Sequence, residues 1–365
     1  MLIGIDASRA YTGENSGTEN YSRELIEAIL KLPEAKKHEF RLYTKKTLNW
    51  SRLWTQGGLA WELWQRPVDV LWIPAHTLPI LRSKKIKTVV TIHGLEYEYL
   101  PEYYDWRKRW YLNKSTEYAV KQADKIIAVS KWTKKQLVER LGAEEKKIKV
   151  IYEGVSRKLI QQGPASKLKL QERTFMRQIR YKYGIGKDYI LFIGTIQPRK
   201  NLVRLIEAFA TLNKGETFVK ESLELVIGGK KGWMAEEIYQ APKKFGVVKQ
   251  VKFIGRVADA DLAGIYKGAR LFIWPSLMEG FGLPVLEAMS LGVPVITSNR
   301  GALPEVVGEA GLLVDPEKVE EISGAMELVL NNQELEQGLI EKGYRQAKKF
   351  SWQKAAKQTL EFLTT

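Results

Sequence analysis

The stretch Leu271-Phe-Ile-Trp-Pro-Ser-Leu-Met-Glu-Gly-Phe-Gly-Leu-Pro-Val-Leu-Glu-Ala-Met289 decides the fold. It opens with a short, continuous apolar run that ends at Pro275, which is typical of a strand buried on both faces. A loop with two glycines follows, and Pro284 suits the first turn of a helix. The segment therefore predicts a strand, a tight loop and a helix, which together form the repeating unit of an α/β protein.

The same alternation runs along the whole chain and restarts once. Strands are expected at residues 2–6, 68–73, 88–92, 125–129 and 149–152, then at 189–194, 223–228, 251–254, 271–274 and 293–297. Helices are expected at residues 18–32, 105–123, 133–141, 203–212, 261–267, 284–291 and 319–331. Residues 155–188 form the seam between the two series. This pattern predicts an α/β fold of two Rossmann-like, doubly wound parallel-sheet domains that face each other across a cleft.

Length and composition narrow the class of protein. The chain has 365 residues, 44% of them apolar and 27% charged, as in globular domains. It has no cysteine, which excludes disulfides and thiolate chemistry, and no apolar run approaches the roughly 20 residues that cross a bilayer. The N-terminus reads as a strand rather than a signal peptide, so a cytoplasmic location is expected.

The net charge of +16 is unevenly distributed. Residues 1–160 hold 29 Lys and Arg against 19 Asp and Glu, whereas residues 189–365 are close to neutral with 22 against 21. A basic first half indicates a nucleic acid, an anionic membrane surface or an acidic acceptor as its partner. Simple solubility is the alternative.

Two carboxylates flank the loop that precedes the helix in the opening segment. Glu279 lies before the helix and Glu287 lies one turn inside it. A helix start attracts anions, glycines let a ligand approach the backbone, and a carboxylate accepts hydrogen bonds from paired hydroxyls. The pattern suits a sugar diphosphate, although two solvated glutamates near a helix start would look the same.

A second strand-to-helix loop carries two adjacent cations. In Ile190-Leu-Phe-Ile-Gly-Thr-Ile-Gln-Pro-Arg-Lys-Asn201, a strand is followed by Gly194 and then by Arg199 and Lys200. Cations at a helix start oppose the helix dipole, so their presence there favours a bound anion such as a diphosphate. A solvated surface pair is the alternative.

These motifs resemble those of the family 4 retaining glycosyltransferases. The resemblance rests on Gly194 to Asn201, on the Glu279-x7-Glu287 segment and on Ser298-Asn-Arg-Gly-Ala-Leu-Pro-Glu-Val-Val307. Thr91-Ile-His-Gly-Leu-Glu96 and Gly228-Gly-Lys-Lys-Gly-Trp233 are most similar to bacterial mannosyltransferase-like members that build cell-surface polysaccharides. The resemblance implies the GT-B architecture. Residues 1–170 with a returning helix at 350–365 would form the acceptor-side domain, and residues 171–349 the nucleotide-sugar domain.

The resemblance also implies a role for each matching residue. Arg199 and Lys200 would neutralise the diphosphate leaving group, Glu279 would hold donor-sugar hydroxyls and Glu287 the ribose. His93 would reach the reacting sugar from the first domain. The other expected donor contacts are Gly17, Ser130, Gly194, Gly255, Arg256, Val257, Gly280, Phe281, Gly282 and Leu283, with Ser130 alternatively capping the next helix.

Two positions depart from the family pattern. Relatives often carry Asp directly after the histidine, where this chain has Gly94, so the role of a neighbouring carboxylate is open. Relatives also have adjacent glycines in the first loop, whereas here Gly13 and Gly17 are separated. A histidine with a purely structural role is the alternative for His93.

No cofactor and no metal are expected. Asp259-Ala-Asp261 resembles the Asp-x-Asp of metal-dependent transferases, but it opens an expected helix, where acidic residues cap and complement the dipole. The resemblance implies metal-independent transfer with retention, by a front-face route in which Arg199, Lys200 and the helix start meet the charge that develops on the diphosphate.

The donor and the acceptor are expected from the same resemblance. GDP-mannose is the favoured nucleotide sugar, and the acceptor would be a glycan or a lipid-linked sugar. Tryptophans at positions 50, 54, 61, 64, 72, 106 and 110 are interleaved with Arg and Lys in the basic half. They either pack against the domain or face an acceptor at an anionic inner-membrane surface. No nucleic acid is expected.

Other functions remain open at this point. A nicotinamide dehydrogenase would need Gly-x-Gly-x-x-Gly after the first strand, which residues 4–13 do not supply. A basic nucleic-acid- or membrane-binding protein without transferase activity would leave the Glu-x7-Glu segment unexplained. A sugar-nucleotide epimerase or a glycan phosphorylase could use the same fold.

Overall fold

The computed structural model describes residues 1–11, 17–44, 54–156, 159–160, 169–214 and 223–365. Contacts divide the chain into two compact units: unit 1 is Met1–Gly154 with Phe350–Thr365, and unit 2 is Val155–Lys349. The sequence placed the first boundary at residue 170, whereas the units divide at Gly154. Helix α7 (Lys169–Lys182), within the expected seam, packs against α10 (Asp259–Lys267) of unit 2.

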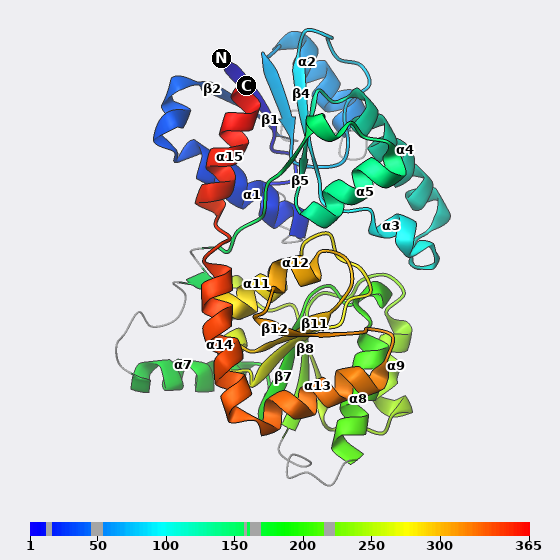
Figure 1. Ribbon diagram of the computed structural model, residues 1–365, viewed down its shortest axis with the longest axis vertical. Coiled ribbons are helices and arrows are strands. Elements are labelled where there is room, and N and C mark those ends of the chain that lie inside the picture. Colours follow the sequence, from blue (N-terminus) through cyan, green and yellow to red (C-terminus); the bar gives the residue numbers. More distant parts are fainter. Residues whose placement is uncertain (12–16, 45–53, 157–158, 161–168, 215–222) are drawn as a thin grey trace. The chain divides into compact units, whose positions relative to one another are not determined.

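Each unit is built on one parallel sheet of six strands (Figure 1). In unit 1 the spatial order is β2-β1-β3-β4-β5-β6. The strands are β1 (Leu2–Asp6), β2 (Glu39–Tyr43), β3 (Val70–Ile73), β4 (Lys87–Ile92), β5 (Lys125–Ala128) and β6 (Ile148–Val150). The inner strands β3, β4 and β5 are buried almost throughout, as their runs of Val and Ile predict.

Helices connect these strands and cover both faces of the sheet. They are α1 (Gly17–Leu30), α2 (Ala60–Gln65), α3 (Glu96–Tyr99), α4 (Trp106–Gln122), α5 (Lys131–Leu141) and α15 (Trp352–Thr364). The red helix α15 lies along the dark-blue α1 in Figure 1, and the two pack together. Parallel strands need crossover connections, and their right-handedness places the helices on opposite faces as the strand order reverses.

The sheet of unit 2 has the order β12-β11-β10-β7-β8-β9. Its strands are β7 (Asp188–Ile193), β8 (Leu223–Gly228), β9 (Val251–Gly255), β10 (Leu271–Trp274), β11 (Val295–Ser298) and β12 (Gly311–Val314). Its remaining helices are α8 (Leu202–Lys214), α9 (Glu236–Lys244), α11 (Leu283–Ser290), α12 (Leu303–Val307), α13 (Val319–Asn331) and α14 (Gln333–Ala347).

The predicted α/β class and the two parallel sheets are confirmed. The sequence missed β2 and β12, which are both edge strands. Most residues of β2 are exposed or half-buried, and β12 has one fully buried residue, Val314. An edge strand loses the continuous apolar run that marks a central parallel strand, so the signal on which the prediction depended is absent there.

Candidate active site

The strand order of unit 2 reverses between β7 and β10. From β7 the chain proceeds outward through β8 and β9, then returns to the other side of β7 for β10, β11 and β12. In open parallel sheets, ligands bind beyond the carboxyl ends of the strands at such a switch point, because the loops there diverge and leave space. The loop after β7 carries Arg199 and Lys200, and the loop after β10 carries Glu279.

These three side chains meet in one ion cluster. Arg199 Nη1 lies 3.0 Å from Glu279 Oε2, and Lys200 Nζ donates to Glu279 Oε1. The side chains are almost buried, with exposed fractions of 17% for Arg199, 6% for Lys200 and 9% for Glu279. The charges of these three side chains, two cations and one carboxylate, sum to +1.

Hydrogen bonds fix both loops around the cluster. Ser276 Oγ donates its proton to Glu279 Oε1, the nearer acceptor at 2.6 Å, and also lies 3.1 Å from the Arg199 carbonyl oxygen. The Leu277 amide also donates to the Arg199 carbonyl, at 2.9 Å, and Arg199 Nη1 donates to the Met278 carbonyl at 3.0 Å. The loops after β7 and β10 are therefore joined by the protein's own hydrogen bonds.

Glu279 is ionised in this setting. Burial is the largest single influence and raises the pKa of its carboxyl, but the charges of Arg199 and Lys200 and the hydrogen bonds from Lys200 and Ser276 together outweigh it. Together they lower the pKa of Glu279 to about 2. Glu279 thus gives the two adjacent cations a partner inside the protein, whereas the sequence analysis considered a bound anion, with a solvated surface pair as the alternative.

Lys200 also packs against an aromatic ring. Its Nζ lies 4.3 Å from the centroid of the Trp274 ring, and Trp274 stacks on Phe192 with centroids 4.7 Å apart. Gly194 makes room for this indole, because a Cβ at that position would lie 2.6 Å from Trp274 Cη2. The structure therefore gives Gly194 a packing role, while its expected contact with a donor stays a prediction.

The glycine-rich loop after β8 is tied to the loop after β7. The Gly194 amide donates to the Gly228 carbonyl at 2.8 Å, and the Ile196 amide to the Lys230 carbonyl at 2.9 Å. Gly229 has a φ of +149°, and a Cβ there would lie 1.8 Å from the Gly194 carbonyl oxygen. The Gly229 amide in turn donates to the Gly255 carbonyl at 2.7 Å, so the strand ends of β7, β8 and β9 form one connected edge.

The remaining expected donor contacts of unit 2 lie along the same edge. Gly255 has a φ of +67° and is the last residue of β9. Arg256, which is exposed, and Val257, which is almost buried, follow it. Gly282 has a φ of +110° and is the N-cap of α11. The buried Gly280, Phe281 and Leu283 surround it, so backbone and apolar groups flank the start of that helix.

Glu287 lies on α11, apart from the ion cluster. It accepts a hydrogen bond from Tyr266 Oη at 2.9 Å. Burial raises the pKa of Tyr266, and the neighbouring Glu287 charge raises it further, so the phenol remains a donor. Glu287 is half-buried, and its Tyr266 partner from α10 was not anticipated from the sequence.

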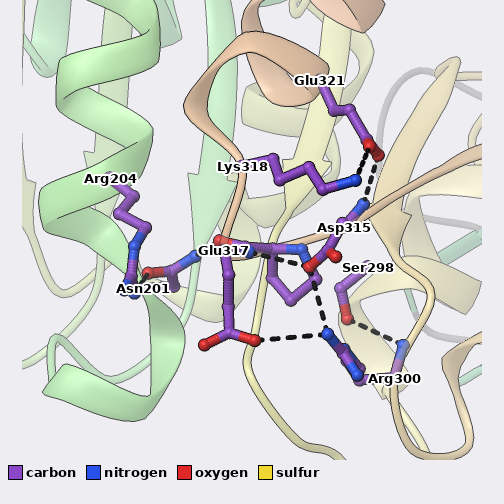
Figure 2. A network of polar contacts seen from close by, with 9 residues as sticks. Asn201, Arg204, Ser298, Arg300, Asp315, Glu317, Lys318 and Glu321 are labelled. Atoms are coloured by element: carbon purple, nitrogen blue, oxygen red, sulfur yellow. Dashed lines mark hydrogen bonds and ion pairs between the residues drawn. The ribbon is translucent and has the colours of Figure 1, made fainter.

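A polar network holds Asn201, the residue that follows Lys200. Asn201 has a φ of +60°. Its side-chain Nδ2 donates to the Pro316 carbonyl, and its Oδ1 accepts from Arg204 Nη1 at 3.0 Å. Figure 2 shows the network continuing through the turn after β12. Arg300 Nη2 reaches Asp315 and Glu317 at 3.2 Å each, and Glu321 accepts from the Asp315 amide at 2.9 Å. The turn carrying Lys200 is thus anchored to the loops after β11 and β12.

In unit 1, His93 follows β4, and its side chain makes internal contacts through both ring nitrogens. Nε2 lies 3.0 Å from the Pro74 carbonyl, which can only accept, so Nε2 carries a proton. Nδ1 lies 3.4 Å from Glu153 Oε1, and the ring meets Tyr21 edge-on at 4.5 Å. The His93 amide donates to His76 Nε2 at 3.0 Å. These contacts match the structural role that the sequence analysis gave as the alternative for His93. Its contact with a sugar remains a prediction.

Ser130 follows the neighbouring strand β5 and caps α5. Its Oγ accepts from the Thr133 amide at 3.0 Å, and the side chain is fully buried. The predicted capping role is confirmed. Gly17 is the exposed first residue of α1, where a Cβ would meet open space, and Gly13 lies outside the described residues.

The described tryptophans among those singled out in the basic half divide into two groups. Trp54 and Trp72 are buried and donate to Asp6 and Thr91, as the packing interpretation expected. The exposed ones are Trp61, Trp64, Trp106 and Trp110. Trp50 lies outside the described residues.

One detail of the Asp259-Ala-Asp261 interpretation was wrong. Both aspartates lie in the first turn of α10, as expected, but the N-cap is Ala258 and no side chain caps the helix. Asp261 instead accepts from Lys182 and from Tyr183 Oη at 2.8 Å, because α7 packs against this end of α10. No group of three or more His, Asp and Glu that could hold a metal occurs among the described residues.

Sequence reasoning missed several residues that build the site. Ser276 and Trp274 contact the ion cluster. Asn201 ties the residue after Lys200 to the Pro316 carbonyl, and Glu153 lies against His93. Only Ser276 left a signal, since it lies three residues before Glu279 in the same loop. The others act through contacts between segments distant in sequence.

Comparison with known proteins agrees with this arrangement. The Glycosyltransferase Family 4 model matches residues 16–159, and the model of glycosyl transferases group 1 matches residues 175–346. The chain is 34% identical to the O-antigen chain mannosyltransferase B of Escherichia coli over 275 residues, covering 75% of this chain and 69% of that protein. It is 30% identical to the E. coli serotype-specific mannosyltransferase WbdA over 70% of this chain, which is 30% of WbdA.

Solved structures share the fold at low sequence identity. Sucrose-phosphate synthase from Thermosynechococcus elongatus superimposes with a TM-score of 0.77 at 18% identity, over 99% of this chain and 98% of that one. WaaG, a glycosyltransferase involved in lipopolysaccharide biosynthesis, gives 0.75 at 16% identity over the full length of both chains. With two GT-B-type parallel sheets, both family models and a relative of this similarity, the chain belongs to the family 4 glycosyltransferases.

Proposed function

We propose that the protein transfers a hexose, with mannose favoured, from a nucleotide diphosphate sugar to a glycan or lipid-linked acceptor, with retention and without a metal. The observation that carries the proposal is the Arg199–Lys200–Glu279 cluster at the β7/β10 switch point. It keeps a net positive charge next to the start of α11, where a diphosphate gains from both the cations and the helix dipole. The preference for mannose rests on the E. coli mannosyltransferases named above.

In this proposal Arg199 and Lys200 stabilise the leaving diphosphate. Negative charge grows on its oxygens as the sugar–oxygen bond breaks, and cations already fixed in position need no reorganisation to meet it. Glu279 orients those cations and offers its remaining acceptor capacity to hydroxyls of the donor sugar. Glu287, on α11, holds the ribose hydroxyls. The backbone at Gly255–Val257 contacts the base.

A donor panel tests this function directly. The purified chain would be incubated with GDP-mannose, GDP-glucose, UDP-glucose and ADP-glucose and with α-mannobiose as acceptor. Product would be followed by mass spectrometry, and its anomeric configuration by NMR. We expect transfer from GDP-mannose with an axial linkage, unaffected by EDTA. An equatorial product would contradict retention, loss of activity with EDTA would contradict metal independence, and conversion of the donor without transfer would indicate an epimerase.

The proposal includes a location at an anionic inner-membrane surface. Helix α4 presents Trp106 and Trp110, which are 70% and 62% exposed, with Arg107, Lys108 and Lys114 exposed beside them. Residues four apart share one face of a helix, and aromatic rings with cations suit a lipid–water interface. None of the described helices is long and apolar enough to span a membrane.

Vesicle co-sedimentation tests the membrane contact. We expect binding to vesicles rich in phosphatidylglycerol, weaker binding at high salt, and loss in a Trp106→Ala/Trp110→Ala variant. Trp233→Ala, an exposed tryptophan of unit 2, is the matched control and should bind normally. Equal binding by the α4 variant would exclude this surface, and binding to nucleic acid instead of vesicles would give the basic half a different partner.

A further inference from the structure

His93 has a hydrogen-bond acceptor against each of its two ring nitrogens. Nε2 lies 3.0 Å from the Pro74 carbonyl oxygen, and Nδ1 lies 3.4 Å from Glu153 Oε1. A neutral imidazole has one N–H and one lone pair, so with the proton on Nε2 the lone pair of Nδ1 would face the carboxylate. One additional proton between Nδ1 and Oε1 turns this repulsion into an attraction. The geometry is therefore that of a pair that shares a proton.

Burial favours the protonated form of this pair. The side chains of His93 and Glu153 are only 12% and 6% exposed, so little water reaches them. Burial disfavours a charged carboxylate and raises the pKa of Glu153, and the neighbouring His93 offsets only part of this effect. The Glu153 carboxyl therefore keeps a proton more readily than an ordinary glutamate does.

Two other titratable side chains face the imidazole of His93, and both are neutral. The His76 ring stacks on it with centroids 5.7 Å apart, and His76 Nε2 accepts from the His93 amide at 3.0 Å. Burial lowers the pKa of His76 well below its usual range, and the charges of His93 and Arg9 add to this effect. Tyr21 meets the imidazole edge-on at 4.5 Å, and burial raises the pKa of its phenol. Neither side chain gives the imidazole a charged partner.

A second carboxylate lies beside the next residue along the chain. Gly94 has a φ of +154°, and a Cβ there would lie 2.6 Å from Glu96 Oε1. The sequence left open whether a carboxylate neighbours His93. The structure places two in this region: that of Glu96 against the Gly94 backbone and that of Glu153 against the ring nitrogen. Glu153 is thus the carboxylate whose contact with the imidazole is observed.

Close packing holds both members of the pair. Gly154 follows Glu153, and a Cβ at Gly154 would overlap the backbone of Ser351 and Trp352 at the start of α15. The Tyr21 ring lies against His93 and also against Trp352, with the centroids of the latter pair 5.7 Å apart. Helices α1 and α15 therefore limit the movement of the carboxylate and of the imidazole.

We propose that Glu153 is a positioning residue for His93: it holds one proton between its Oε1 and His93 Nδ1 at neutral pH, and so keeps Nε2 directed at the Pro74 carbonyl. The effect on sugar transfer rests on the proposed transferase function. When the pH rises far enough, the pair releases this proton to solvent and the charge stays on Glu153. The lone pair of Nδ1 then faces a carboxylate, which disfavours this orientation of the ring.

NMR of the ¹⁵N-labelled histidine rings tests the shared proton without any substrate. The chain has three histidines, and a His93→Gln variant assigns the resonances of His93. At neutral pH we expect Nδ1 of the wild type to show a bound or shared proton. In Glu153→Gln the side-chain amide can donate to Nδ1, so this nitrogen should show a lone pair instead. Glu96→Gln is the matched control and should resemble the wild type.

The NMR comparison has clear contrary results. The same Nδ1 resonance in the wild type and in Glu153→Gln would overturn the proposal. So would a loss of the Nδ1 proton in Glu96→Gln, because the partner of the imidazole would then be the other carboxylate. Circular dichroism would show that each variant is folded.

The pH dependence of transfer separates positioning from a purely structural role. We expect kcat of the wild type to fall at alkaline pH, where the pair loses its proton. Glu153→Gln should keep its neutral-pH kcat there, because its amide holds the ring without an ionisable proton. Glu153→Ala should lower kcat on the order of 10²-fold at neutral pH, with less change in the KM for GDP-mannose. A lower unfolding temperature with the wild-type pH profile retained in Glu153→Gln would refute the positioning role.

The two measurements distinguish this inference from the function on which it rests. A chain that transfers no sugar from any donor refutes the proposed function, and the NMR comparison still decides whether His93 and Glu153 share a proton. Normal transfer together with the same Nδ1 resonance in the wild type and in Glu153→Gln refutes the positioning role alone.

Discussion

The Lys200 ammonium lies over the Trp274 ring, 4.3 Å from its centroid, while Glu279 binds the same ammonium from the loop after β10. A cation in a largely buried site is stable only when its charge is met on several sides. Here one side is a carboxylate and another is the negative face of an indole. The arrangement fixes the direction in which Lys200 can present its charge to a ligand.

Replacing Lys200 should reduce turnover strongly. Lys200→Ala removes a positioned cation, and loss of one such group costs about 10²–10³-fold in kcat. Because Lys200 is a buried partner of Glu279, the stability of the fold should also fall. Arg199 keeps Glu279 paired, so we expect a loss of about 1–3 kcal/mol in urea unfolding. Lys231→Ala, an exposed cation of the neighbouring loop, should be near normal. A Lys200→Ala enzyme with more than a tenth of wild-type turnover would refute the assignment.

Acid should destabilise the protein through Glu279. Its folded pKa of about 2 lies below the ordinary value of 4.5, so the ionised carboxylate stabilises the fold above about pH 4.5. This contribution is lost as the pH falls from 4.5 towards 2, and it is on the order of 3 kcal/mol. Urea unfolding between about pH 3 and 6 should show a shallower decline in Glu279→Gln than in wild type, while Glu361→Gln, an exposed control, should follow wild type. Parallel curves for Glu279→Gln and wild type would contradict the ion cluster.

Gly229 should tolerate no side chain. A methyl group there would lie 1.8 Å from the Gly194 carbonyl oxygen and would also force an L-residue to a φ of +149°. The strand edge must shift to admit it, so we expect Gly229→Ala to lose more than about 3 kcal/mol. Gly246→Ala is the control, with a φ of +76° and open space around it, and should lose about 1 kcal/mol. Equal losses in thermal unfolding would show that the contact with Gly194 is not tight.

Asn201 should act on Lys200 through the backbone. Asn201→Gly keeps the positive φ but removes the bond to the Pro316 carbonyl, whereas Asn201→Ala loses both features. We expect Asn201→Gly to lose about 1–3 kcal/mol and Asn201→Ala about 1 kcal/mol more. If Asn201 positions Lys200, kcat falls in both variants while the donor KM changes less. A change confined to unfolding temperature would make the residue purely structural.

The sequence predicted central strands and loop chemistry well, because both depend on local patterns. The apolar runs at β4, β7 and β10 marked buried strands, and the residues after β7 and β10 were recognised as one site. The sequence could not show that Glu279 forms ion pairs with Arg199 and Lys200, because 79 positions separate Glu279 from Lys200. Long-range pairs of this kind, including His93 with Glu153, leave no periodic signal in a single chain.

Helix α15 follows unit 2 in the chain but packs against α1 of unit 1, where Gly154 lies against the Ser351 and Trp352 backbone. During translation, residues 1–154 therefore leave the ribosome with the apolar side of α1 uncovered, and they stay so while the whole of unit 2 is synthesised. The rings of Tyr21 and Trp352 have centroids 5.7 Å apart, and Trp352 is synthesised more than 300 residues after Tyr21. Unit 2 can fold as it emerges, whereas unit 1 closes only after synthesis of α15, so nascent chains should depend most on chaperones in that interval.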